Sequence, residues 1–121
     1  MANKETILVT GASGFIGGRI VETLHLRGLA NVRAGIRQWA SAARIGRFPI
    51  EIVLCDVMDK KQIVQAMTGV TAVIHCALGP GGVTIQGTKN MLDAAFRSGV
   101  KRFVHLSTIA VYGKVSGHVD E

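Results

Sequence analysis

Apolar and amphipathic stretches alternate along the chain. Residues 7–9 form a continuous apolar run that stops at turn residues, which is typical of a strand buried in a parallel sheet. Further strands are predicted at 32–36, 50–55, 70–76 and 101–107. Because predicted helices separate these strands, the pattern indicates an α/β fold, a Rossmann-like doubly wound parallel sheet of about five strands.

The predicted helices have recognisable starts and ends. In the first, Ile16, Ile20 and Leu24 recur at helical spacing and Gly28 follows as the C-terminal glycine. Asp59, with Gln62 three positions later, predicts a capping box that opens a helix over 60–67. A third helix is predicted to bury one face and to end at Gly99; that face consists of Ile85, Thr88, Met91, Leu92, Ala95 and Phe96.

The segment 37–49 gives no clear prediction, because residues 39–45 could form two turns of helix but Gly46 and Pro49 interrupt any longer element. With 121 residues, 48% of them hydrophobic, we expect one domain spanning 1–121. The formal charge of +6 raises the question of a nucleic-acid partner. The basic residues are scattered and aromatic residues make up only 5%, so we expect no nucleic-acid partner.

The two cysteines, Cys55 and Cys76, lie in apolar runs and lack the spacing of metal ligands. They are expected to be buried thiols of a reducing compartment, and no metal site is predicted. We expect no leader sequence before the first strand, and no apolar run approaches the length needed to cross a membrane. We therefore expect a cytoplasmic protein with no membrane partner.

Three evenly spaced glycines follow the first strand, in the segment TGASGFIGG. Gly11 permits a tight turn, Gly14 leaves room for a phosphate, and Gly17 allows the helix to pack closely on the strand. A helix N-terminus with unpaired N–H groups then faces the anion. The spacing is G-x-x-G-x-x-G and not the commoner G-x-G-x-x-G.

Polar or small residues follow every predicted strand. Because ligands bind at the carboxyl ends of parallel strands, these residues are expected at one edge of the sheet together with the glycines. They are Thr10 and Gly11, Arg37, Asp56, His75 to Ala77, and Ser107 with Thr108. Their convergence favours a dinucleotide site over a glycine-rich turn without a ligand.

Several ordered segments resemble the N-terminal part of the extended short-chain dehydrogenase/reductase family, the NAD(P)-dependent epimerase/dehydratase group. They are TGASGFIG at 10–17, DV at 56–57, VIHCA at 73–77, GTKNMLDAA at 87–95 and GVKRFVHLSTIAVYG at 99–113. The resemblance implies a Rossmann fold that binds NAD or NADP and chemistry that moves a hydride to or from a nucleotide sugar or another alcohol or ketone.

The resemblance assigns cofactor-binding roles to thirteen residues. The glycines with their neighbours hold the pyrophosphate, Asp56 and Val57 contact the adenine, and Ala77 approaches the nicotinamide-side ribose. The full set is Gly11, Ser13, Gly14, Phe15, Ile16, Gly17, Arg37, Asp56, Val57, Cys76, Ala77, Leu78 and Ser107. Asp56 could alternatively cap the turn towards Asp59, and His75 and His105 are interpreted as structural strand residues.

The end of the second strand distinguishes NADP from NAD. NAD enzymes place Asp or Glu there, whereas an Arg favours the 2′-phosphate of NADP. Here Ile36 and Arg37 occupy these positions, and no carboxylate lies between Thr23 and Phe48. Arg33, Arg44 and Arg47 are expected to add positive charge nearby. NADP is predicted over NAD, although these arginines could instead be solvated surface residues.

The resemblance assigns catalysis to Thr108, the hydroxyl that binds the substrate oxygen. The family's Tyr-x-x-x-Lys pair is absent, since Tyr112 is the only tyrosine and Ser116 follows it four residues later. Thr84 stands where the family often has an Asn. The chain thus resembles a fragment that binds cofactor and needs further chain for catalysis on a small-molecule substrate. A non-catalytic NADP-binding regulatory module is the alternative, and the exposed edge of the fifth strand indicates a possible homo-oligomer.

Overall fold

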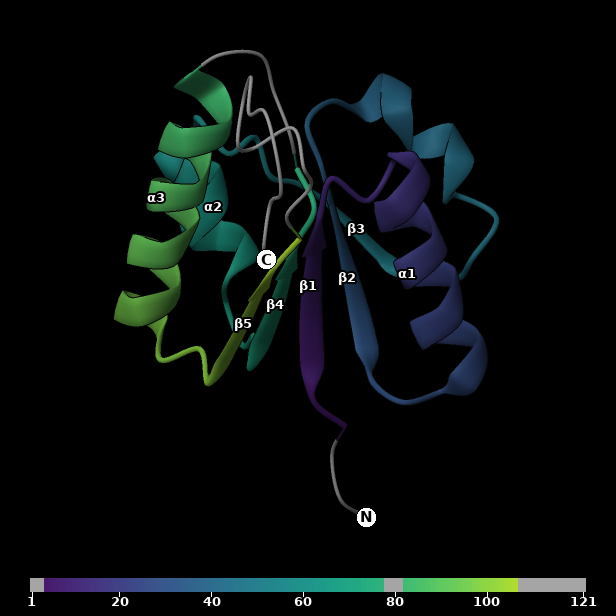
Figure 1. Cartoon of the computed structure of the whole chain (residues 1–121). Coiled ribbons are helices and arrows are strands. Elements are labelled where there is room, and N and C mark those ends of the chain that lie inside the picture. The colour runs from purple at the N-terminus through teal and green to yellow at the C-terminus, as the bar shows by residue number, and fades with distance from the viewer. Residues whose placement is uncertain (1–3, 78–81, 107–121) are drawn as a thin grey trace, which may run out of the picture.

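A computed structural model describes residues 4–77 and 82–106 of the chain. It contains one parallel sheet of five strands, in the order β3-β2-β1-β4-β5 (Figure 1). The strands are β1 (Thr6–Thr10), β2 (Asn31–Ile36), β3 (Glu51–Leu54), β4 (Ala72–His75) and β5 (Arg102–His105). The predicted Rossmann-like fold is confirmed, and the direction of the strand order reverses between β1 and β4.

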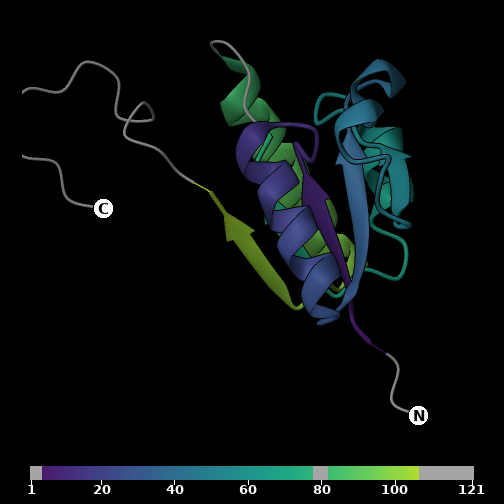
Figure 2. The ribbon, with the colours of Figure 1, turned by 90° about the vertical axis from the view of Figure 1, so that its right-hand side faces the viewer.

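Helices cover both faces of this sheet. They are α1 (Phe15–Arg27), the 3₁₀ helix η1 (Trp39–Arg44), α2 (Lys60–Ala66) and α3 (Gly82–Ser98). Helix α1 lies on one face, and α2 and α3 lie on the other (Figure 1). Figure 2 views the sheet from the α1 side and shows β5 at its edge. None of the helices in the described ranges is long and apolar enough to cross a bilayer.

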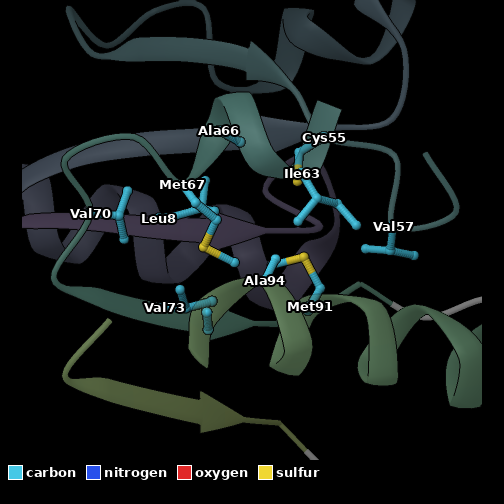
Figure 3. Close-up of a cluster of buried hydrophobic side chains, with 11 residues drawn as sticks. Leu8, Cys55, Val57, Ile63, Ala66, Met67, Val70, Val73, Met91 and Ala94 are labelled. Carbon is cyan, nitrogen blue, oxygen red and sulfur yellow. The ribbon is translucent and has the colours of Figure 1, made fainter. Parts of the chain in front are cut away.

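Two hydrophobic clusters fill the layers between sheet and helices. Leu8 and Val73 point from the sheet towards α2 and α3, where they meet Ile63, Met67 and Met91 (Figure 3). The alternate residues of the same strands belong to the second cluster, on the α1 face; it includes Val9, Val21, Val32, Ala34, Ile36 and Ile45. Because successive side chains of a strand point to opposite faces, continuous apolar strands supply both layers.

The predicted buried face of α3 is partly wrong. Met91 and Ala95 are buried as expected, but the larger apolar residues Ile85, Leu92 and Phe96 are exposed. The helix instead buries a face that includes small and polar residues, namely Gly87, Asn90, Met91, Ala94 and Ala95. The small side chains on this face let the helix approach its neighbours closely. The buried face of α3 therefore lies next to the more hydrophobic face that carries Ile85, Leu92 and Phe96.

The start of α2 follows half of the predicted capping box. The Asp59 carboxylate accepts the backbone N–H groups of Lys61 and Gln62, which satisfies two free donors of the first turn. The Gln62 side chain does not return to Asp59; its Oε1 accepts the backbone N–H of Asp56 at 2.9 Å. This bond ties α2 to the loop that follows β3.

Candidate functional site

A cleft of about 620 Å³ opens at the carboxyl edge of the sheet. This volume falls within the range of about 300–1,000 Å³ that is usual for small-molecule sites. Its lining includes eleven of the residues expected to bind cofactor: Gly11, Ser13, Gly14, Phe15, Ile16, Gly17, Arg37, Asp56, Val57, Cys76 and Ala77. The structure therefore brings together residues from the ends of four strands, with the glycine segment in the middle.

The glycine turn is held by close backbone contacts. Gly11 has φ of 63°, and a β-carbon there would lie 2.8 Å from backbone atoms of Cys76 and Ala77. A β-carbon on Gly17 would lie 2.1 Å from the carbonyl oxygen of Gly11. Both positions therefore require glycine, so that β1, the start of α1 and the end of β4 can meet.

The middle glycine leaves space of a different kind. Apart from its neighbours in the chain, the described atom that a β-carbon at Gly14 would meet within 4 Å is the Gly11 carbonyl oxygen, at 3.2 Å, and Gly14 lines the cleft. Gly14 is also the N-cap of α1, where no side chain caps the helix and no acidic residue occupies the first turn. The N–H groups of Phe15, Ile16 and Gly17 thus begin a helix whose positive end faces an open space, an arrangement that fits a phosphate or diphosphate.

The wall of the cleft beyond β3 is a loop held by hydrogen bonds. One carboxylate oxygen of Asp56 accepts the backbone N–H of Met58 at 3.0 Å. Asn90 of α3 donates to the carbonyl oxygen of Val57 at 2.9 Å. Asp56 therefore does cap a local turn, which was the alternative interpretation, while it also lines the cleft.

Positive charge at the cleft comes from Arg37, which is exposed and lines the cavity directly after β2. The neighbouring Ile36, at the position expected for an acidic residue in NAD enzymes, is fully buried. Two of the other arginines are engaged elsewhere. Arg33 pairs with Glu51 at 2.7 Å and donates to the carbonyl oxygens of Ala66 and Thr68, whereas Arg47 pairs with Glu22 at 3.7 Å.

Arg33 and Arg47 are close to Arg37 in the sequence, but their side chains bind elsewhere. Arg33 lies inside β2, three residues before its end, and its guanidinium satisfies carbonyl groups at the C-terminus of α2. Within the described lining of the cleft, Arg37 is the one arginine.

Beneath the cleft, a buried hydrogen-bond chain joins β1, β4 and α3. The Thr10 hydroxyl oxygen accepts the backbone N–H groups of Cys76 and Ala77 at 3.1 and 3.4 Å. Its own proton is then directed to Nδ1 of His75, 2.7 Å away. The ring proton of His75 consequently lies on Nε2, from which it is donated to the Thr88 hydroxyl at 3.2 Å, and Thr88 donates to the carbonyl oxygen of Thr84.

His75 is thus a structural residue, as expected. It is 1% exposed, and burial, followed by the charge of neighbouring His105, lowers its pKa to about 4. The neutral ring that this pKa maintains is the form that can accept from Thr10 and donate to Thr88. His105 stacks on His75 with 5.4 Å between the ring centroids and is exposed.

The two cysteines differ in position but share a suppressed acidity. Cys55 is buried, and burial together with the Asp56 carboxylate raises its pKa to about 12. Cys76 is half-buried in the lining of the cleft, and burial raises its pKa. Both thiols are free and protonated at neutral pH, so neither is an activated nucleophile.

Three expected site residues, Leu78, Ser107 and Thr108, lie outside the described residues, as does Tyr112. The cleft also contains residues that the sequence interpretation did not include: Gln38, Ser41, Cys55, Met58, Val83 and Leu106. Gln38 and Ser41 extend the wall beside Arg37, and their place directly after the second strand was the available signal. Val83 comes from the first turn of α3, a contribution that depends on how that helix packs.

Comparison with known proteins gives a consistent result. The sequence model of a family described as NAD(P)H-binding matches residues 11–121. The chain is 34% identical over 130 residues to dTDP-glucose 4,6-dehydratase of Streptomyces antibioticus, an alignment that covers 90% of the chain and 39% of that protein. The chain spans little more than a third of the length of the curated relatives it matches.

Two solved structures show the same fold. A short-chain dehydrogenase/reductase superfamily protein from Agrobacterium tumefaciens with bound NAD aligns with a TM-score of 0.74 and 29% identity, over 90% of this chain and 34% of the other. The NADPH-dependent quinone oxidoreductase of Escherichia coli, complexed with NADPH, aligns with a TM-score of 0.73 and 25% identity, over 82% and 35%. The two neighbours thus carry different forms of the nicotinamide cofactor.

Proposed function

The chain belongs to the NAD(P)H-binding family, among the extended short-chain dehydrogenases/reductases, and we propose that it binds a nicotinamide dinucleotide in this cleft. Within that function, we propose that it binds NADP(H) in preference to NAD(H). The observation that carries the preference is Arg37. It directly follows β2 and lines the cleft, and its neighbours in the sequence, Ile36 and Gln38, carry no negative charge. A carboxylate at this point would hold the ribose 2′-hydroxyl of NAD, whereas a guanidinium pairs with a 2′-phosphate.

The cofactor would extend along the carboxyl edge of the sheet. The start of α1, with Gly14, would hold the diphosphate, and Arg37, Asp56 and Val57 would hold the adenosine. Cys76 and Ala77, after β4, would hold the opposite end. This orientation follows the strand order, because β2 and β3 lie on one side of β1 and β4 lies on the other.

The reaction that we propose for the whole protein is hydride transfer to or from an alcohol or ketone, a nucleotide sugar being one such substrate. The nicotinamide supplies the hydride chemistry when the cofactor is bound. Thr108 would hold the substrate oxygen through its hydroxyl. The Tyr-x-x-x-Lys pair that the family uses for proton transfer is absent from these 121 residues, so we expect binding of cofactor without turnover by this chain alone.

Equilibrium titration of the purified chain with NADPH and NADH, followed by calorimetry or by quenching of the single Trp39, tests the proposal. We expect both to bind and NADPH to bind about tenfold or more tightly, since a phosphate–Arg contact contributes about 1.5–3 kcal/mol. Tighter binding of NADH would contradict the proposed preference. Failure of both to bind would contradict the proposed function itself.

A further inference from the structure

The segment GTKN at residues 87–90 is not explained by contact with a ligand. It belongs to α3, and none of its four residues lines the cleft. We propose that Thr88 and Asn90 are positioning residues that set the two opposite walls of the dinucleotide cleft. This inference rests on the proposed function and assigns these residues a part in it.

Asn90 acts on the wall that follows β3. Its side chain is buried, donates to the Val57 carbonyl oxygen at 2.9 Å, and accepts the side-chain N–H of Gln86 at 2.9 Å. Gly87 makes room for the same contact, because a β-carbon there would lie 2.5 Å from a methyl group of Val57. Helix α3 therefore contacts both the backbone carbonyl and the side chain of Val57. Val57 lies in the wall that we assign to the adenosine.

Thr88 acts on the wall that follows β4. It accepts the Nε2 proton of His75, and His75 in turn accepts the proton of Thr10. The Thr10 oxygen holds the backbone N–H groups of Cys76 and Ala77, which line the other end of the cleft. Each donor in this series of hydrogen bonds has one acceptor. Loss of the Thr88 hydroxyl therefore leaves the buried Nε2 proton of His75 without its partner.

The two walls come from strands on opposite sides of β1. One turn of α3 contacts the wall after β3 directly, through Asn90, and is linked to the wall after β4 through His75 and Thr10. The helix thereby fixes the separation between the adenosine wall and the nicotinamide-side wall. The consequence is selective: a change at Asn90 should disturb the binding of any ligand that contains the adenosine, whereas a change at Thr88 should disturb only a ligand that reaches past the diphosphate.

The test compares NADPH with 2′,5′-ADP, which lacks the nicotinamide half. Thr88→Val should weaken NADPH binding about tenfold, the size expected for the loss of one buried hydrogen bond. The binding of 2′,5′-ADP should stay within about twofold of its value in the unmodified chain. Thr88→Ser retains the hydroxyl and should restore NADPH binding. Asn90→Leu, similar in size but without the amide, should weaken both ligands about tenfold.

Lys89 provides the matched control, since it is exposed between the two positions, and Lys89→Gln should bind both ligands like the unmodified chain. Titrations are done below the unfolding temperature of each variant, so that loss of folding is measured separately by thermal melting. Equal losses for both ligands in Thr88→Val, or no rescue by Ser, would show a general structural effect and overturn the inference. If the unmodified chain binds neither ligand, the proposed function fails first.

Discussion

Gly17 and Gly11 are packed so closely that a β-carbon on Gly17 would lie 2.1 Å from the carbonyl oxygen of Gly11. That distance is far below any van der Waals contact, and the opposing atom belongs to the backbone. The start of α1 can therefore lie against the β1 turn only if position 17 has no side chain. The same contact fixes the direction in which the first N–H groups of α1 point.

We predict that Gly17→Ala destabilises the fold by about 1–3 kcal/mol, the usual cost of overpacking, and abolishes measurable NADPH binding. Urea unfolding gives the first quantity and titration with NADPH gives the second. Gly18→Ala is the control on the same helix, because its β-carbon would lie 3.3 Å from the Ala12 carbonyl oxygen, a tight contact that a shift of a few tenths of an ångström relieves. Since alanine also favours helix, Gly18→Ala should be close to neutral. Equal behaviour of the two variants would contradict the close-packing argument.

The second prediction concerns the choice of cofactor. Arg37→Gln removes the positive charge of the cleft wall and leaves a side chain of similar length. It should weaken NADPH binding by about tenfold to a hundredfold, in line with about 1.5–3 kcal/mol for a charged hydrogen bond, and change NADH binding little.

Arg47→Gln is the matched control for this experiment. Arg47 pairs with Glu22 and does not line the cleft, so this variant should keep the preference of the unmodified chain. A loss of preference in Arg47→Gln, or a retained preference in Arg37→Gln, would show that the 2′-phosphate is held elsewhere.

The third prediction uses the position of Cys76 as a probe of ligand binding. Cys76 lines the cleft, and burial raises its pKa, so we expect slow reaction with a thiol reagent at pH 7.5. Saturating NADPH should slow that reaction further by about tenfold, because the ligand covers the sulfur. Cys55, with a pKa raised to about 12, should react only on unfolding.

Mass spectrometry after partial labelling assigns the modified residue, and Cys76→Ser removes the protected fraction. If NADPH leaves the labelling rate of Cys76 unchanged, the ligand does not reach the end of β4. The proposed orientation along the sheet edge would then be wrong even if NADPH binds.

Much of this architecture could be predicted from local patterns. The strand positions followed from short apolar runs, and the glycine segment predicted the β1–α1 turn that the structure contains. Both signals are local: a buried parallel strand must be apolar on both sides, and positions such as Gly11 and Gly17 tolerate no side chain whatever the rest of the chain does.

The parts that could not be predicted depend on tertiary placement. Helical periodicity identified an apolar stripe on α3 that includes Phe96, yet Phe96 is 88% exposed and Asn90 is buried. Asn90 is buried because Val57 and Gln86 satisfy its amide, and those partners lie on a distant loop and on the preceding turn. Arg33 was placed near the cleft by sequence proximity, although the direction of β2 carries it towards the end of α2.

The last prediction concerns pH. Burial and the charge of His105 lower the pKa of His75 to about 4 in the folded protein, against 6.5 for the unperturbed side chain. Between these values the unfolded chain binds a proton that the folded chain does not, so the free energy of unfolding falls as pH falls from 6.5 towards 4. Below pH 4 both states are protonated and this contribution levels off.

The expected loss from this group is about 2 kcal/mol between pH 7 and pH 5, measured as the change in the free energy of urea unfolding. This loss arises because the charged ring is buried and lies beside His105. A protonated Nδ1 also can no longer accept the proton of the Thr10 hydroxyl. His75→Gln should be less stable than the unmodified chain at pH 7, because it lacks the hydrogen bonds of the imidazole ring. Since glutamine cannot be protonated in this range, the variant should lose less stability on acidification. An unchanged slope in His75→Gln would mean that another group controls the acid sensitivity, and that the neutral ring is not what holds β1, β4 and α3 together.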